Sequence, residues 1–481
     1  MPLLLLGYLL LFNEANGDNI VNVDIAASEK WIISPYLATT HMMYTNGADK
    51  VYNGTLVKWM KKNKIRAGRY PGGTLAAIWD WENPCGGFGC WSLEPGSNKW
   101  KAPEENWMSM EEYMDFVDKT GMTPLVGVNY NNHEHLDWMS EEESVEKAKR
   151  QAEYVVNKRG YKGKGAFFYI GNEDNVQHYP ERWRKHALAI KQVDPTIKTI
   201  FNYNQLKPDD LKEIIVGVGI DAVDGAEFHG KWPRGGKQDL YEVTPKYWME
   251  EVPLFNRSKG LGTYRERTKK LRETLEEMGV KKDFILANNE FGLNPVDPSV
   301  YSGFNRYTLS LVNIEFALEM FKSGLDMMAF WDNVGDEFAG ECMLMDKDNG
   351  YRMNPVHFGL EMLWRSVEMK MLEMTTSADR LHGFCATHGG KKTICYLLNK
   401  YETEQTFMFR GDTKRFTPWD TELLIETLVD PEGALDTKDP QAHWGKVLTD
   451  NKTLKLKSWQ KEKFTHTVPA LSFVTLTFIK P

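Results

Sequence analysis

The sequence lacks the usual marks of several protein classes. It contains no CxxC pair and no HExxH motif, two spacings that commonly hold zinc. Its 59 basic side chains are outnumbered by 67 acidic ones, and no basic block indicates a nucleic-acid surface. Internal repeats and low-complexity tracts are also absent. We therefore expect no metal, no other cofactor and no nucleic-acid partner.

Long apolar runs are scarce too. The run from Pro2 to Phe12 is shorter than the roughly 20 residues that span a bilayer, and no other run approaches that length, so we expect no membrane association. The small residues Ala15-Asn16-Gly17 fit cleavage by a signal peptidase, which predicts a signal peptide at residues 1–17 and a secreted protein. The run has no Lys or Arg before it, which leaves a truncated or wrongly assigned start as the alternative. Acceptor tripeptides for N-glycans begin at Asn53, Asn256 and Asn451, as in a secreted glycoprotein.

Cysteine is rare, and the five residues cannot all pair with one another. Cys85 and Cys90 flank a glycine-rich loop and could form a small disulfide. Cys385 and Cys395 could bridge the two strands of a hairpin, which would leave Cys342 free.

The length of 481 residues exceeds the roughly 250 residues of an ordinary (β/α)8 barrel, so we expect two domains. Apolar runs that predict strands alternate with helical patterns, which favours a parallel barrel. The eight expected barrel strands are residues 31–36, 64–70, 122–129, 166–173, 197–203, 221–229, 284–290 and 325–331. From about Met369, short runs alternate around turn residues and predict a β-sandwich. The predicted fold class is α/β, with a (β/α)8 TIM barrel at 31–366, an accessory β-sandwich at 367–481, and a strand at 18–30 that joins the sandwich.

Two helix starts carry a specific signature. Ser109 with Glu112, and Ser140 with Glu143, have the spacing of a capping box, in which a hydroxyl and a carboxylate satisfy backbone N–H groups of the first turn. Gly121 is expected to end the first of these helices.

Two of the expected strands end in a glutamate. Residues 166–173 read AFFYIGNE and end in Glu173, whereas residues 284–292 read FILANNEFG and contain Glu290. In a (β/α)8 barrel the carboxyl ends of the strands carry the chemistry, so both carboxyl groups would face one cleft. Glycoside hydrolysis with retention needs one protonated and one ionised carboxyl group about 5 Å apart. The pair therefore indicates a glycosidase, with Asn172 placed to hydrogen-bond a sugar hydroxyl.

These residues resemble a known group of enzymes. Gly171-Asn172-Glu173 on the fourth strand and Glu290 on the seventh resemble clan A of the glycoside hydrolases, which are retaining (β/α)8-barrel enzymes. Residues 69–73, RYPGG, and Val128-Asn129 look like the α-L-arabinofuranosidase branch and its relatives, including enzymes that cut agar, xylan and heparan chains. The trailing sandwich completed by an N-terminal strand also resembles that branch.

The resemblance implies a role for each matching residue. Glu173 would be the general acid/base and Glu290 the nucleophile, Arg69 would orient the nucleophile, and Asn172 would hold the sugar 2-hydroxyl. His229 and Trp331 match positions that line the subsite of the cleaved bond, and Asn129 belongs to the motif of the third strand. Two departures leave the substrate open: Asp174-Asn175 replaces a frequent Pro, and Asn131-Asn132-His133 replaces the Gly-Thr-Gly of arabinofuranosidases.

Several candidates have a plain structural interpretation beside the functional one. Trp79, Trp81 and Trp232 lie in long polar loops, where their rings could stack on sugars or simply fix the loops. His229 alone is more often a core histidine. Glu227 shares a strand face with His229 and is the reserve carboxylate.

The sequence thus predicts a secreted retaining glycoside hydrolase that needs no cofactor and acts on a cell-wall or matrix polysaccharide. The long tryptophan-bearing loops favour endo-action, and an exo-acting arabinofuranosidase or glucuronidase is the alternative. A carbohydrate-binding protein without turnover on the same scaffold is the rival from another class, and transglycosylation would use the same residues.

Overall fold

A computed structural model gives the structure of the protein. It describes residues 20–42, 54–73, 76, 80–82, 92–93, 100–101, 108–130, 139–173, 176–203, 206–230, 245–250, 255–256, 262–280, 282–292, 304–331, 333–335, 345–346, 352–411, 421–435, 442–454 and 464–480. The expected signal peptide, Asn53, Cys85, Cys90 and Cys342 lie outside these ranges.

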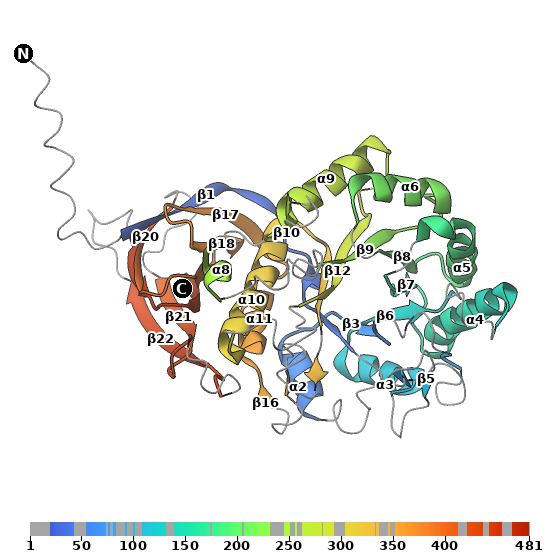
Figure 1. The fold of residues 1–481 in the computed structure, drawn as a ribbon, viewed down its shortest axis with the longest axis horizontal. Coiled ribbons are helices and arrows are strands. Elements are labelled where there is room, and N and C mark those ends of the chain that lie inside the picture. The colour runs from blue at the N-terminus through green and yellow to red at the C-terminus, as the bar shows by residue number, and fades with distance from the viewer. Residues whose placement is uncertain are drawn as a thin grey trace, which may run out of the picture.

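Eight parallel strands form a closed barrel, which confirms the predicted TIM barrel (Figure 1). They are β2 (Thr39–His41), β3 (Ala67–Tyr70), β6 (Thr123–Val128), β7 (Phe167–Ile170), β8 (Lys198–Tyr203), β9 (Gly225–Gly230), β12 (Ile285–Phe291) and β13 (Met327–Phe330). Side chains that alternate along the strands fill the barrel interior, among them Leu125, Phe167, Ile200 and Met327. Residues of the opposite parity, such as Phe168 and Phe201, pack outward against the helices.

The first barrel strand lies later in the chain than predicted. Residues 31–36 do not form it, because Ile32 ends the long strand β1 (Ile20–Ile32) and Pro35 opens the short helix η1 (Pro35–Leu37). The barrel strand β2 follows at Thr39, in a run whose Thr and His residues carry little apolar signal. The other seven predicted strands each overlap an observed one.

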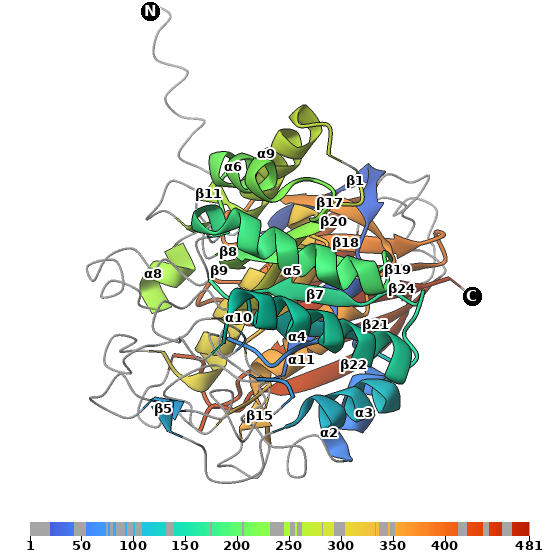
Figure 2. The ribbon, with the colours of Figure 1, turned by 90° about the vertical axis from the view of Figure 1, so that its right-hand side faces the viewer.

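In the described part of the chain, eight helices of eight or more residues pack around the barrel strands (Figures 1 and 2). They are α2 (Thr55–Lys62), α3 (Met110–Thr120), α4 (Glu141–Glu153), α5 (Pro180–Val193), α6 (Pro208–Val218), α9 (Tyr264–Glu277), α10 (Arg306–Ser323) and α11 (Pro355–Trp364). Shorter elements are η5 (Tyr154–Lys158), η6 (Val176–His178) and α8 (Pro245–Glu250), with the strand pairs β4–β5 (Ser92–Leu93, Trp100–Lys101) and β10–β11 (Phe255–Asn256, Gly262–Thr263) and the three-stranded sheet β14–β16 (Val334–Gly335, Met345–Asp346, Arg352–Met353).

The predicted helix starts are present. Ser109 and Glu112 form the capping box of α3, and Gly121 ends that helix in the left-handed conformation with φ 75°. The Ser140 hydroxyl accepts a hydrogen bond from the Glu143 N–H at 3.1 Å at the start of α4. These caps fix where the helices begin beside β6 and β7.

The accessory domain is a nine-stranded sheet that curls around a core of its own. Its order is β22-β21-β24-β19-β18-β17-β1-β20-β23, from β17 (Lys370–Thr376), β18 (Leu381–His388), β19 (Lys392–Asn399), β20 (Gln405–Gly411), β21 (Thr421–Val429), β22 (Lys446–Leu454), β23 (Phe464–Val468) and β24 (Ser472–Ile479), with β1. Figure 1 shows the arc of β20, β1, β17, β21 and β22 beside the barrel. Cys385 and Cys395 pair across β18 and β19 and form a disulfide. The predicted barrel with an accessory β-sandwich is thus the observed architecture.

The outer face of this sheet packs against the last barrel helices. Phe384 and Tyr396 belong to the same apolar core as the barrel helices, and the Tyr396 hydroxyl donates to the Met362 carbonyl of α11 at 3.0 Å. The Tyr307 hydroxyl of α10 reaches the carbonyls of Leu428 and Leu471 at 2.8 and 2.9 Å. The sheet therefore supports the side of the barrel formed by α10 and α11.

A buried ion pair joins the same two parts. The Lys400 ammonium lies 3.0 Å from a carboxylate oxygen of Glu315 on α10, and both side chains are fully buried. The other Glu315 oxygen lies 3.0 Å from His382 of the sheet, and Trp248 of α8 donates to Glu315 at 2.6 Å. Removing one member would leave an uncompensated charge inside the protein.

We expect Lys400→Met to lower the free energy of unfolding by about 3 kcal/mol, because Glu315 would lose its main counter-charge. The shift of the urea denaturation midpoint measures this loss. The double variant Lys400→Met/Glu315→Gln should recover more than half of it. A single variant as stable as the wild type would show that the pair does not hold the two parts together.

Candidate active site

Polar side chains from six barrel strands converge at the carboxyl end of the barrel. They are His41 at the end of β2, Arg69 on β3, Asn172 and Glu173 after β7, Asn202 on β8, Glu227 and His229 on β9, and Asn289 and Glu290 on β12. We call this set the polar cluster. All of its side chains are buried except that of Glu173, which is partly exposed. Such a cluster at this end of a barrel is where chemistry is expected.

The backbone after β7 turns sharply so that two consecutive side chains enter the cluster. Gly171 has φ 81° and Glu173 has φ 54°, and the latter is uncommon for a residue with a side chain. The Glu173 N–H donates to the Asn202 carboxamide oxygen at 2.6 Å, which holds this conformation. Such local strain tends to persist at functional sites where neighbouring contacts hold it.

Glu290 enters the cluster because of an irregularity in β12. Ala287 pairs with Glu227 and Glu290 pairs with His229 on β9. Between these two pairs, β12 advances by three residues and β9 by only two, so β12 contains one extra residue. The pairing with β13 shifts at the same place. This β-bulge lets Asn289 and Glu290, although adjacent in sequence, both contact the interior of the barrel mouth. A regular strand would have placed one of them on the outer face.

Arg69 lies at the centre of the cluster and is fully buried. One terminal nitrogen is 2.8 Å from Asn172 and 2.8 Å from Glu227, and the other is 2.6 Å from His41 and 3.5 Å from Glu290. Its guanidinium also lies 4.2 Å from the Tyr169 ring. The shortest contact of Arg69 with a carboxylate is therefore with Glu227, and the contact with Glu290 is longer.

His229 lies between three carboxylates. Its Nδ1 is 2.8 Å from Glu173 and 3.4 Å from Glu290, whereas its Nε2 is 3.1 Å from Glu227. One oxygen of Glu173, one of Glu290 and one His229 ring nitrogen all lie within 4.8 Å of one another. The two glutamates predicted from the sequence are thus brought together at a single centre.

Burial and neighbouring charges shift the ionisation of this centre. Burial opposes the charged forms of Glu227 and His229, but nearby groups outweigh it. Arg69, with hydrogen bonds from His229 and Asn289, holds the pKa of Glu227 below its ordinary value. The carboxylates of Glu290, Glu173 and Glu227 raise the pKa of His229. Glu227 and His229 are therefore both ionised from below the ordinary pKa of a glutamate to above that of a histidine.

The three groups Glu173, His229 and Glu290 are also close enough to reach one cation. The guanidinium of Arg69 lies 3.5 Å from Glu290, and its positive charge opposes a metal ion at this place. We therefore assign no metal ligand here.

The remaining predicted residues border the cluster or lie elsewhere. Asn129 follows β6 at the same end of the barrel. Trp331 follows β13, and the centroid of its ring lies 4.2 Å from that of His41. The ring also lies close to Gly73, whose φ is 55°, and a side chain there would place its Cβ only 2.9 Å from Trp331. Trp81 instead donates to the Lys147 carbonyl of α4 at 3.1 Å and packs near Tyr154, so its contacts are with the outer helices. Trp79 and Trp232 lie outside the described residues.

Four residues of this site were not predicted from the sequence. Asn202 and Tyr169 were detectable, because they share strand parity with the inward residues Ile200 and Phe167. Asn289 was hidden by the bulge in β12, and His41 by the misplaced first strand.

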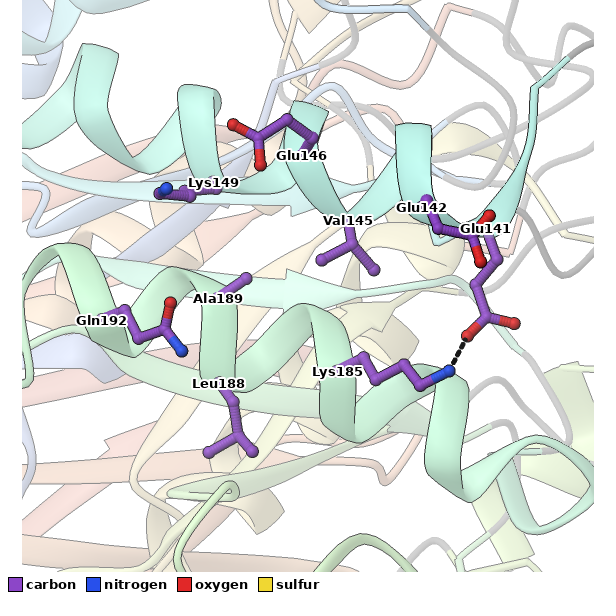
Figure 3. A pocket seen from close by; sticks show the side chains of 9 residues that line it. All are labelled: Glu141, Glu142, Val145, Glu146, Lys149, Lys185, Leu188, Ala189 and Gln192. Atoms are coloured by element: carbon purple, nitrogen blue, oxygen red, sulfur yellow. Dashed lines mark hydrogen bonds and ion pairs between the residues drawn. The ribbon is translucent and has the colours of Figure 1, made fainter.

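A separate groove lies on the outer surface between α4 and α5, as Figure 3 shows. Glu141, Glu142 and Glu146 line it together with Lys149 and Lys185, and Lys185 bonds Glu141 at 2.6 Å. These residues belong to the helical shell and contribute nothing to the polar cluster.

Comparison with known proteins agrees with this architecture. Residues 59–229 match the family model described as "Alpha-L-arabinofuranosidase 1 domain", a range that includes Arg69, Glu173 and His229 and stops before Glu290. No curated protein matches the sequence. Among solved structures, the arabinofuranosidase of glycoside hydrolase family 51 from Xanthomonas axonopodis pv. citri superposes with a TM-score of 0.66 at 15% identity, over 95% of this chain and 99% of that one.

Two further structures superpose over similar spans. The α-L-arabinofuranosidase of Thermotoga maritima gives a TM-score of 0.67 at 14% identity, over 95% of this chain and 99% of that one. A family 44 endoglucanase from Clostridium acetobutylium gives 0.61 at 15% identity, over 96% and 99%. The chain has the fold of the clan A glycosidases. The predicted resemblance to clan A is thereby confirmed at the level of the fold, which arabinofuranosidases and an endoglucanase share.

The shifted pKa of His229 predicts a dependence of stability on pH. Because the folded-state pKa is raised, the stabilisation is complete below the unfolded value of about 6.5 and is lost as pH rises through the folded value. We expect the free energy of unfolding to fall above pH 6.5, and His229→Gln to flatten that fall in urea titrations from pH 5 to 9.

His186 provides a matched control with the opposite sign. Burial between α4 and α5 lowers its pKa to about 4. As pH falls below about 6.5, the unfolded chain binds a proton that folded His186 does not, so the free energy of unfolding falls. His186→Gln should flatten only the acid side, by about 2 to 3 kcal/mol between pH 6.5 and 4.5. An unchanged alkaline fall in His229→Gln would show that the His229 ring is not charged in the folded protein.

Proposed function

We propose that this protein is a retaining glycoside hydrolase that uses Glu173 as general acid/base and Glu290 as nucleophile. The observation that carries the proposal is the proximity of the two carboxylates, which have oxygens within 4.8 Å of each other in the mouth of the barrel. Carboxyl groups about 5 Å apart suit double displacement, whereas the inverting mechanism needs room for a water between them.

The two glutamates have environments that suit different roles. The Glu173 side chain is 24% exposed, so it can reach a leaving-group oxygen, whereas Glu290 is 4% exposed and lies beside Arg69 and His229. Positive neighbours favour an ionised carboxylate, as a nucleophile requires. Asn172 is fixed by Arg69 next to Glu173, which supports its proposed contact with a sugar hydroxyl.

The proposed reaction proceeds in two steps. Glu290 attacks the anomeric carbon while Glu173 donates its proton to the departing oxygen, and a covalent glycosyl-enzyme forms. Glu173, now ionised, then takes a proton from water, which attacks the same carbon and releases the sugar and the Glu290 carboxylate. Arg69, Asn129 and Trp331 border the space in which the sugar would bind.

We further propose a cell-wall or matrix polysaccharide as substrate and secretion as the location of the protein. The support is the predicted leader, together with glycan acceptor sites of which Asn451 is exposed on β22. Among the described residues, no helix is both long and apolar enough to cross a membrane.

Endo-action and exo-action make different products. The tryptophan-bearing loops are the sequence-based reason to expect endo-action, although Trp81 packs against the outer helices. The family-model match to an arabinofuranosidase domain favours the exo-acting arabinofuranosidase as the second candidate. Incubation with arabinan, xylan, agar, glucan, galactan and glycosaminoglycan should release mixed oligosaccharides early in the first case. An exo-enzyme would release only single sugars.

Substitution of each glutamate tests the roles. Glu290→Gln should lower turnover by at least about 10⁴-fold on every substrate, because no nucleophile remains. Glu173→Gln should lose turnover on natural glycosides but retain formation of the glycosyl-enzyme from nitrophenyl glycosides, whose leaving groups need no proton. Reducing-end and nitrophenol assays on the two variants measure this.

Glu142→Gln is the matched control, because Glu142 lies in the outer groove between α4 and α5. It should keep wild-type turnover. Full activity of Glu290→Gln or of Glu173→Gln on a natural glycan would contradict the assigned role, and glycan binding without turnover in the wild type would favour the carbohydrate-binding alternative.

A further inference from the structure

Glu227 is a third carboxylate in the cluster that the proposed reaction leaves unused. It has no exposed surface and lies deeper than Glu290, in the strand position two residues before His229. One of its oxygens is 2.8 Å from Arg69, 2.6 Å from the Asn202 amide and 3.1 Å from His229 Nε2, and the other accepts from Asn289 at 3.0 Å. With both oxygens occupied and no access to solvent, Glu227 cannot reach an anomeric carbon.

We propose that Glu227 is a positioning residue that holds Arg69 and His229 behind the two candidate catalytic carboxylates and balances their charge. The inference rests on the proposed function, because it assigns Glu227 a part in keeping Glu173 ready to act as the acid.

The hydrogen-bond geometry fixes which His229 nitrogen faces which partner. A carboxylate accepts hydrogen bonds and cannot donate them, so a bare Nε2 lone pair 3.1 Å from Glu227 would be repelled. The Asn202 amide nitrogen lies 3.0 Å from Nε2 and donates to the same Glu227 oxygen at 2.6 Å, so we assign both N–H groups to that oxygen. In this assignment Nε2 carries a hydrogen that it donates to Glu227. This leaves Nδ1 for Glu173 at 2.8 Å and for Glu290 at 3.4 Å, so Glu227 aims the opposite side of the ring at both carboxylates.

A charge count shows what Glu227 adds. The described cations that face the site are Arg69 and a protonated His229. His41 accepts a hydrogen bond from Arg69 through Nε2, because arginine can only donate, and is therefore counted as neutral. Two ionised carboxylates, Glu227 and Glu290, balance the two cations. An ionised Glu173 would add a third negative charge, a cost that its favourable contact with His229 at 2.8 Å opposes. Glu173 is also the one partly exposed carboxyl group of the three, so it is placed to gain and lose a proton, as a general acid must.

Removing the charge of Glu227 would favour the ionised form of Glu173. Only Glu290 would then oppose the two cations, and a negative charge on Glu173 would restore a net charge of zero. The proton on Glu173 would be lost at lower pH, and His229 would also lose its proton more easily. The expected result is a pH profile of kcat/KM displaced to lower pH as a whole.

The test compares the pH profile of kcat/KM in the wild type, Glu227→Gln and Glu227→Asp. Glu227→Gln should move the alkaline limb down by about one pH unit, as loss of a charge within a few ångströms does. Glu227→Asp keeps the charge at a shorter reach, so it should lower kcat while leaving the limbs within a few tenths of a unit of the wild type.

Glu315→Gln is the matched control, because Glu315 is also a fully buried carboxylate paired with a cation, but it lies on α10 against the accessory sheet. It should lower stability without moving either limb. If Glu227→Gln folds and its limbs stay where they are in the wild type, Glu227 has only a packing role and the inference fails.

A second measurement keeps the inference separate from the proposed function. NMR titration of histidine ring signals, with His229 assigned by its loss in His229→Gln, requires no substrate. The wild-type His229 ring should keep the hydrogen on Nε2 throughout the titration. In Glu227→Gln the ring should change its titration point or the signal of its hydrogen-bonded Nε2. If Glu227→Gln does not fold, the same change is expected in Glu227→Asp. A wild type that cleaves no glycan would overturn the proposed function alone, whereas a His229 ring that titrates identically in all these proteins would overturn the role of Glu227.

Discussion

The buried contact between Arg69 and Glu227 is the interaction on which the site depends. Both side chains are completely removed from water, where two opposite charges are tolerated only with close hydrogen-bond partners. The terminal nitrogens of Arg69 contact Asn172 and His41, while its Nε has no partner among the described residues. Glu227 accepts from Asn202, His229 and Asn289. These partners come from five different strands, so the ion pair fixes the strands' ends relative to one another.

Irregular backbone at two places near this pair brings the two candidate catalytic carboxylates, Glu173 and Glu290, into the cluster. The left-handed Glu173 follows β7, and the bulge in β12 carries Glu290 to the same centre. A regular barrel with strict alternation would present fewer polar groups at this height. The accessory sheet acts at a distance, through α10 and α11, by supporting the side of the barrel that follows β12.

Periodicity predicted much of this and missed the rest for identifiable reasons. Seven barrel strands were recognisable because their apolar runs are strong, and the helix starts at Ser109 and Ser140 because their capping chemistry is local. The first barrel strand was misplaced because Thr39 to His41 has no apolar run and the preceding apolar residues belong to β1 and η1. Glu173, Glu290, Arg69 and His229 were selected in advance. The contact of Arg69 with Glu227 was not, because pairing between side chains of different strands depends on register, and a bulge changes register without a clear mark in the sequence.

In the proposed reaction Glu290 forms a covalent bond to the sugar, while Glu227 only positions its neighbours. A panel of activated 2-deoxy-2-fluoro glycosides, including arabinofuranosyl, xylosyl, glucosyl and galactosyl forms, would trap such an intermediate, because the fluorine slows its hydrolysis. Digestion of the labelled protein and mass spectrometry of the peptides would then locate the sugar. We expect one sugar on the peptide that contains Glu290, whereas a label on Glu227 or Glu173 would show that another carboxylate is the nucleophile.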